Sequence, residues 1–138
     1  MNLSSIRICL LFALLIGCHT DRGDDPSVPV RNFYQALYAG DTAAMLNNWT
    51  SDLRSKFRNS GDSTLRMATE YMHEKNLKAE IKINEVHMDS TFPNMAVVHF
   101  SVKVIGDNHA SVDSVNLHVA KEEGDWKISS LDLHRDHE

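Results

Sequence analysis

Apolar residues recur at helical spacing in the first part of the chain and at alternate positions in the second part. Val30, Phe33, Tyr34 and Leu37 lie three and four positions apart, which predicts an amphipathic helix with one buried face. Gly40 follows, and glycine readily adopts the left-handed conformation that ends many helices. The pattern therefore predicts a first helix that stops at Gly40.

Two more helices are expected before the period changes. Asp41 can cap a helix that carries Ala44, Met45 and Trp49. A further helix is expected from about Ser63 to Lys75. Its apolar face is formed by Leu65, Ala68, Tyr71 and Met72. Residues 51–61 have room for one extra turn.

Alternation with a period of two begins at Ala79 and predicts four strands. The alternating apolar residues are Ile81, Ile83, Val98, Phe100, Val102, Val104, Val115, Leu117, Val119, Trp126 and Ile128. In the first strand, Val86 and Met88 continue on the other parity. In the last strand, Leu131 and Leu133 also change parity, so we expect a β-bulge near Ser129 and Ser130.

The predicted strands are separated by short turns at residues 92–94, 106–108 and 123–125. Turns of hairpin length join antiparallel neighbours, and helices that precede such a meander pack on one of its faces. The expected fold class is therefore α+β, with N-terminal helices packed on a curved four-stranded antiparallel sheet.

The first eighteen residues are interpreted as a targeting segment. The stretch from Ile6 to Ile16 is apolar apart from Arg7 and is eleven residues long, whereas a membrane-spanning helix needs roughly 20. A secretory signal peptide fits this length better, and it places the folded domain outside the cytoplasm. An ordinary signal peptide followed by an incidental cysteine is the plainer alternative to the lipid attachment considered next.

Residues 15–18, Leu-Ile-Gly-Cys, resemble the lipobox of bacterial lipoproteins. The resemblance implies cleavage after Gly17, a diacylglycerol on the sulfur of Cys18, and an acyl chain such as palmitate on the new amino terminus. Several acyl chains anchor a protein stably to a membrane. The expected organisation is a signal peptide over 1–17, the lipidated cysteine and a flexible tether over 18–28, and a folded domain over 29–138 in the cell envelope.

Charge and cysteine content exclude several classes of function. The net charge is −5, and removal of residues 1–17, which carry one cation and no acid, changes it to −6. Nucleic-acid binding is not expected, because it requires a basic face. Cys9 leaves with the signal peptide and Cys18 is occupied by lipid. The folded domain then has no thiol for a disulfide, a nucleophile or a metal ligand.

Two short segments resemble the nuclear transport factor 2-like superfamily. They are Val30, Phe33-Tyr34, Ala36-Leu37 and Gly40-Asp41 near the start, and Gly124-Asp125-Trp126-Lys127-Ile128 near the end. The resemblance implies a cone-shaped α+β fold whose sheet wraps around helices and can hold a pocket. Members include ketosteroid isomerases and dehydratases as well as non-catalytic binding modules, so the fold leaves the function open.

An enzyme of this shape needs an acid or base inside the cone. Asp132 is the candidate, because it lies at the parity change of the last strand. Tyr34, Tyr38 and Tyr71 are candidate pocket residues that could donate a hydrogen bond to a developing oxyanion. The plainer alternative makes Asp132 a solvent-facing strand residue and places the tyrosines in the core with hydrated hydroxyls.

Histidines supply the second group of candidates. His99 and His118 lie opposite the apolar faces of strands that are expected to pair, so they could hold Zn²⁺ or Cu²⁺ together with Asp113 or water. The alternative is a hydrated outer face, or a dimer surface that includes Val97. Protonation of all eight histidines would change the net charge of the mature chain from −6 to +2, so partner or membrane association is expected to depend on pH between about 5 and 7.

The function expected from the sequence is non-catalytic binding of a small apolar ligand or a protein partner by a lipid-anchored envelope protein, with no cofactor. An isomerase- or dehydratase-like enzyme that uses Asp132 is one alternative. A structural module that forms a homodimer through the outer sheet face is the other.

Overall fold

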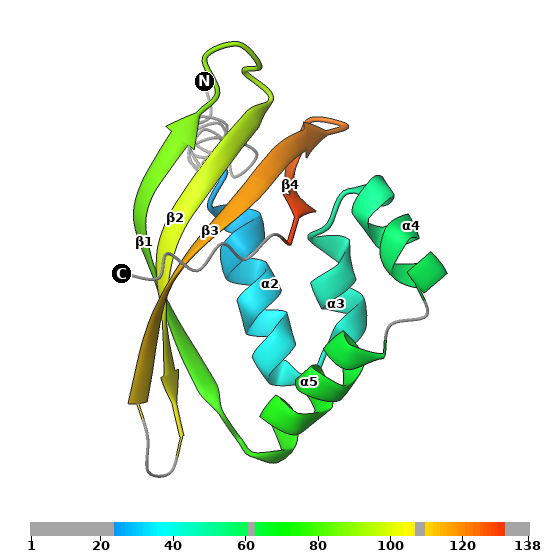
Figure 1. Cartoon of the computed structure of the whole chain (residues 1–138), viewed down its shortest axis with the longest axis vertical. Helices are drawn as coiled ribbons and strands as arrows, with labels where there is room; N and C mark the ends of the chain where they lie inside the picture. Colours follow the sequence, from blue (N-terminus) through cyan, green and yellow to red (C-terminus); the bar gives the residue numbers. More distant parts are fainter. Residues whose placement is uncertain (1–23, 61–62, 107–109, 132–138) are drawn as a thin grey trace, which may run out of the picture.

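The computed structural model describes residues 24–60, 63–106 and 110–131. Its helices come first along the chain and are α2 (Val28–Ala39), α3 (Thr42–Asn47), α4 (Ser51–Ser60) and α5 (Thr64–Glu74). Its strands follow and are β1 (Lys78–Met88), β2 (Met95–Ile105), β3 (Ala110–Glu122) and β4 (Asp125–Ser130). Figure 1 shows a curved sheet with the helices on one side of it. The expected α+β arrangement is confirmed.

The first helix and its connection to the second follow the sequence pattern. Gly40 ends α2 in the left-handed conformation (φ +75°), and its N–H is directed to the carbonyls of Ala36 and Leu37. Asp41 then caps α3, because its side chain accepts a hydrogen bond of 2.9 Å from the N–H of Ala44.

Trp49 lies outside α3, contrary to the sequence prediction. The segment after α3 pairs with the last strand as an isolated parallel bridge between Trp49 and Ile128. The N–H of Ile128 donates to the carbonyl of Asn48 at 2.7 Å, and the N–H of Thr50 donates to the carbonyl of Ile128 at 2.9 Å. This pairing covers the edge of β4 and buries the Trp49 side chain completely.

Residues 51–60 form a complete helix of 10 residues, α4, where the sequence indicated one extra turn. Its inward side is formed by Leu53 and Phe57, which are four positions apart and pack against the core. The ring of Phe57 meets the ring of Trp49 edge to face, with centroids 5.4 Å apart. The contact with Trp49 therefore stabilises α4, which the polar sequence of residues 51–60 did not predict as a complete helix.

The sheet is an antiparallel meander with strand order β1-β2-β3-β4. The predicted bulge in β4 is confirmed, because His118 pairs with Ser130 and Val119 pairs with Ile128, which leaves Ser129 as the extra residue. The change of parity in β1 has the same origin: its register shifts between Ile83 and Glu85, at Asn84.

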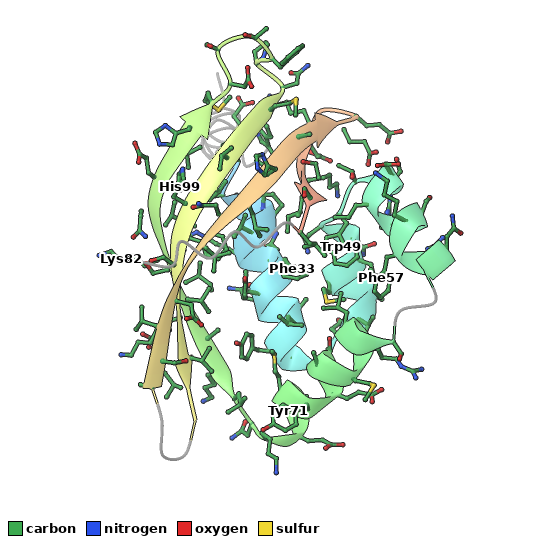
Figure 2. All side chains as sticks on the ribbon, in the orientation of Figure 1. Phe33, Trp49, Phe57, Tyr71, Lys82 and His99 are labelled. Atoms are coloured by element: carbon green, nitrogen blue, oxygen red, sulfur yellow. The ribbon has the colours of Figure 1, made fainter. Side chains whose placement is uncertain are left out.

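A single hydrophobic core lies between the inner face of the sheet and α2. Its buried residues are Val30, Phe33, Ala36, Leu37, Met45, Trp49, Ala96, Val98, Phe100, Val102, Leu117, Val119, Trp126 and Ile128. The rings of Phe33, Trp49 and Phe57 follow one another from α2 across to α4 (Figure 2). These residues fill the space that the helices and the strands enclose, so the candidate sites lie at the margin of the core.

Candidate functional site

Two tyrosines of α2 and one carboxylate of β3 come together at the margin of the core. Tyr34 and Tyr38 lie one helical turn apart, and both pack against the core with their rings partly buried. The Tyr34 ring meets the Phe100 ring edge to face, with centroids 5.4 Å apart. The negative charge of Asp113 lies close enough to act on both phenols.

The register of the sheet explains why Asp113 reaches the tyrosines. Asp113 is paired directly with Val102, and directly paired residues of neighbouring strands share a face. Val102 is buried in the core, so Asp113 lies on the inner face of the sheet, at its exposed margin. Asp113 therefore follows Leu117 and Val115 in the line of β3 side chains on the inner face of the sheet.

Both phenols are held in their protonated form. Burial raises the pKa of Tyr34 to about 12, with further contributions from Tyr38 and Asp113. Burial also raises the pKa of Tyr38, and Asp113 adds to the effect. At neutral pH the site offers two neutral hydroxyls, as tyrosine ordinarily does, each able to donate a hydrogen bond beside a carboxylate that can only accept when ionised.

The third tyrosine predicted for the pocket does not join this cluster. The side chain of Tyr71 is 56% exposed on α5, and its ring faces the ammonium of Lys75 at 6.0 Å. Figure 2 shows Tyr71 at the lower end of the molecule, near the end of α5 from which the chain continues into β1. The face of α5 that packs inward includes the fully buried Thr69, which the sequence pattern had not selected.

The histidines lie on the outer face of the sheet, as expected, but they are not directly opposite each other. His99 is paired with Asn116, and its Nδ1 is hydrogen-bonded to the Asn116 side chain. His118 is paired with Val97, so the two predicted ligands are diagonal neighbours. Asp113 is on the opposite face of β3 and does not reach them.

His87, which the sequence interpretation did not select, is the nearest ring to His99. Their centroids are 5.0 Å apart with the rings nearly perpendicular, and Glu85 lies 3.0 Å from Nε2 of His87. Within the described residues, no group of three His, Cys, Asp or Glu side chains is arranged to hold a metal ion. The change of parity at Asn84 could have identified His87 from the sequence, because the bulge there places Glu85 and His87 on the outer face of the sheet.

Two open grooves lie away from the tyrosine cluster. One has a volume of about 420 Å³ and runs along the end of the outer sheet face, lined by His87, Met88, Met95 and His118 among others. The other, also of about 420 Å³, lies between α2 and α3 and is lined mainly by alanines and by the amides of Asn32, Gln35, Asn47 and Asn48. Neither groove contains any of the three tyrosines.

Two of the site residues predicted from the sequence fall outside the described residues. These are the lipid attachment site Cys18 and the candidate acid or base Asp132. In the parts of the chain that the structure describes, none of the helices combines the length and the hydropathy that a membrane span requires.

No protein-family model matches the chain, and no curated protein matches it in sequence. Solved structures do resemble it. A SEC-C motif containing protein from Rhodopseudomonas palustris aligns with a TM-score of 0.58 at 15% identity, covering 76% of this chain and 75% of that one. An NTF-2 like protein of unknown function from Shewanella oneidensis MR-1 aligns with a TM-score of 0.52 at 16% identity, covering 78% and 98%.

An LEH-like epoxide hydrolase from M. tuberculosis aligns less well, with a TM-score of 0.43 at 14% identity, covering 75% of this chain and 80% of that one. At these identities the alignments establish the fold alone. The fold of this chain, helices packed on a curved four-stranded antiparallel sheet, is therefore similar to that of the NTF-2 like protein, in agreement with the expected fold class.

Proposed function

We propose that this protein is a lipid-anchored binding module of the bacterial cell envelope. Acyl chains on Cys18 hold it at the membrane, and the folded domain binds a small, largely apolar ligand without chemical conversion. The anchor is supported by the sequence of residues 15–18 and by the short apolar segment before it.

The observation that carries the binding function is the cluster of Tyr34, Tyr38 and Asp113 at the margin of the core. The tyrosine rings offer apolar faces, and their partly desolvated hydroxyls can donate hydrogen bonds at neutral pH, where tyrosine is protonated. Val104 and Val115, both partly buried, extend this apolar surface on the sheet. The cluster lies outside the two grooves, at the exposed margin of the core, and its chemistry fits a ligand with an apolar body and one hydrogen-bonding end, such as a carbonyl or a hydroxyl.

A second candidate function, an isomerase- or dehydratase-like enzyme, is favoured by the same cluster. A carboxylate beside two protonated phenols can act as a base while a phenol donates to a developing oxyanion. In this case Asp113 takes the role that the sequence interpretation assigned to Asp132. A binding module releases the bound molecule unchanged, whereas an enzyme converts it.

The test of binding is mass spectrometry of the protein purified under native conditions, followed by ligand titration. We expect a retained small molecule whose affinity falls about fivefold for Tyr34→Phe, since one hydrogen bond to a neutral partner is worth about 1 kcal/mol. Tyr71→Phe changes an exposed tyrosine and is the matched control. Equal affinity of both variants would remove the tyrosine cluster as the site.

The retained molecule can also be used to distinguish binding from catalysis. When it is incubated with the protein and recovered, an unchanged mass and structure support binding. Conversion that is lost in Asp113→Asn while affinity is retained would establish the enzyme instead.

The anchor has an independent test. Cells supplied with labelled palmitate are expected to label the protein, and Cys18→Ser is expected to abolish incorporation. Label that persists in Cys18→Ser would contradict lipid attachment at this residue. Cys9→Ser is the control, because Cys9 belongs to the predicted signal peptide.

A further inference from the structure

Three large apolar side chains are exposed where β1 and β2 meet their connecting loop: Met88 at the end of β1, Phe92 in the loop and Met95 at the start of β2. Their exposed fractions are 51%, 58% and 41%. Large apolar side chains that are exposed close together often belong to a surface that binds a protein or a membrane. We call these three residues the apolar tip.

The apolar tip is held in place by the loop's own hydrogen bonds. The Asp89 side chain accepts from the N–H groups of Thr91 and Phe92, each at 2.8 Å. The N–H of Met95 donates to the carbonyl of Phe92 at 2.9 Å, and the N–H of Asp89 donates to the carbonyl of Met95 at 2.9 Å. The loop therefore presents Phe92 to solvent in a defined turn.

The start of the described chain lies beside this loop. Nζ of Lys121 is 3.1 Å from the Asp24 carboxylate, and the N–H of Lys121 donates to the carbonyl of Asn94 at 2.8 Å. Lys121 thus links the first described residue to the loop that carries the tip. Figure 1 shows the start of α2 and the β1–β2 loop directed toward the same end of the molecule.

The length of chain before Asp24 limits how far this end can lie from the membrane. Cys18 is six residues before Asp24, and six extended residues span at most about 20 Å. A lipid on Cys18 would therefore keep the apolar tip within reach of the headgroup region. The exposed Val112 is on the strand segment that leads away from the tip, toward the opposite end of the β2–β3 hairpin.

We propose that the apolar tip inserts into the interfacial region of the membrane that holds the lipid at Cys18, as a second contact that orients the domain. The inference rests on the lipid anchor of the proposed function. Insertion is driven by apolar contact, because the charges at this end are acidic or paired: Asp89 is bonded within the loop, and Lys121 pairs with Asp24. Aromatic and methionine side chains suit the boundary between headgroups and acyl chains.

The experiment uses the full chain purified from its membrane and reconstituted into phosphatidylcholine vesicles whose acyl chains carry bromine, which quenches tryptophan fluorescence on contact. Phe92→Trp reports on the tip, and Val112→Trp is the matched control, since both positions are more than half exposed. The native Trp49 and Trp126 are buried and contribute the same background to both variants. We expect the brominated vesicles to quench the fluorescence of Phe92→Trp and not that of Val112→Trp. The degree of quenching should not change when phosphatidylglycerol is added to the vesicles.

Mass spectrometry of the same preparation shows whether Cys18 carries lipid, which keeps the two proposals distinguishable. Lipid on Cys18 with no quenching in Phe92→Trp, or with equal quenching in both variants, would overturn insertion of the tip and leave the anchor in place. A mass without lipid would overturn the anchor and, with it, the inference.

Discussion

The carboxylate of Glu122 accepts hydrogen bonds from both the backbone N–H and the hydroxyl of Ser51, so the β3–β4 hairpin caps the first turn of α4. The distances from the Ser51 nitrogen to the two carboxylate oxygens are 3.0 and 3.1 Å. The side chain of Thr50 accepts from the N–H of Leu53 and completes the cap. Two segments 71 positions apart in sequence thus share one helix terminus.

Replacement of this cap is expected to cost stability in a pH-dependent way. The bonds from Ser51 lower the pKa of Glu122, so its contribution is present above about pH 4.5 and is lost as the pH falls through the lowered value. Glu122→Gln is expected to reduce the free energy of unfolding by about 1 kcal/mol at neutral pH, measured by urea titration. The difference from the parent protein should shrink in acid.

Glu123→Gln is the matched control, because Glu123 lies exposed in the adjacent turn. It should leave both the stability and its acid dependence unchanged. Equal effects of the two substitutions would show that net charge, rather than the cap, is responsible.

Phe57 is expected to control the order of α4. Leu53 and Phe57 are the apolar side chains by which this otherwise polar helix packs on the core, and Phe57 does so on the Trp49 ring. Phe57→Ala should therefore increase amide hydrogen exchange across residues 51–59 by more than across α2. Met67→Ala, at an exposed position of α5, is the control. Uniform acceleration in both helices would indicate global destabilisation instead.

The elements that the sequence predicted correctly depend on local interactions. Gly40 and Asp41 end one helix and begin the next through contacts within four residues, and alternation fixes the faces of β2 and β3. Trp49 and α4 were not predicted, because their conformations depend on Ile128 and on the core, which lie far away along the chain. Helical spacing alone could not show that Trp49 pairs with a strand.

The candidate site was predicted in part, and the errors have identifiable causes. The helical spacing predicted correctly that Tyr34 packs against the core, and its role as a pocket residue stays a prediction. Tyr71 was assigned to the buried face of α5 because it is apolar, but Thr69 occupies that face and satisfies its hydroxyl on the Leu65 carbonyl at 2.7 Å. Asp113 shares the parity of Val115, so its inward position was readable from the sequence.

Two glycines with positive φ allow a test of how much a side-chain contact adds to backbone strain. Gly40 (φ +75°) ends α2 and Gly124 (φ +89°) lies in the β3–β4 turn. A Cβ at Gly40 would lie 3.1 Å from Cγ of His73, whereas a Cβ at Gly124 would meet nothing within 4 Å. Gly124→Ala is expected to cost about 1 kcal/mol of unfolding free energy from the left-handed backbone alone. Gly40→Ala should cost more, and His73→Ala in that background should recover the excess. No recovery would assign the whole cost to the backbone.

The raised pKa of Tyr34 predicts a loss of stability at high pH. The unfolded phenol ionises near pH 10.0 and the folded one near 12, so the folded state keeps a proton that the unfolded state releases. The free energy of unfolding should therefore fall by about 2 kcal/mol between these pH values, at about 1.4 kcal/mol per pKa unit. Below pH 10 this contribution is fully present.

Tyr34→Phe isolates the effect, because phenylalanine keeps the ring contact with Phe100 and has no proton to lose. Its stability should match that of the parent below pH 10 and exceed it toward pH 12, measured by urea unfolding at fixed pH. The ultraviolet titration of the folded parent should also show a late phenolate step that the variant lacks. A parent titration without that late step would mean that Tyr34 is hydrated, which would contradict the desolvated environment described for its hydroxyl.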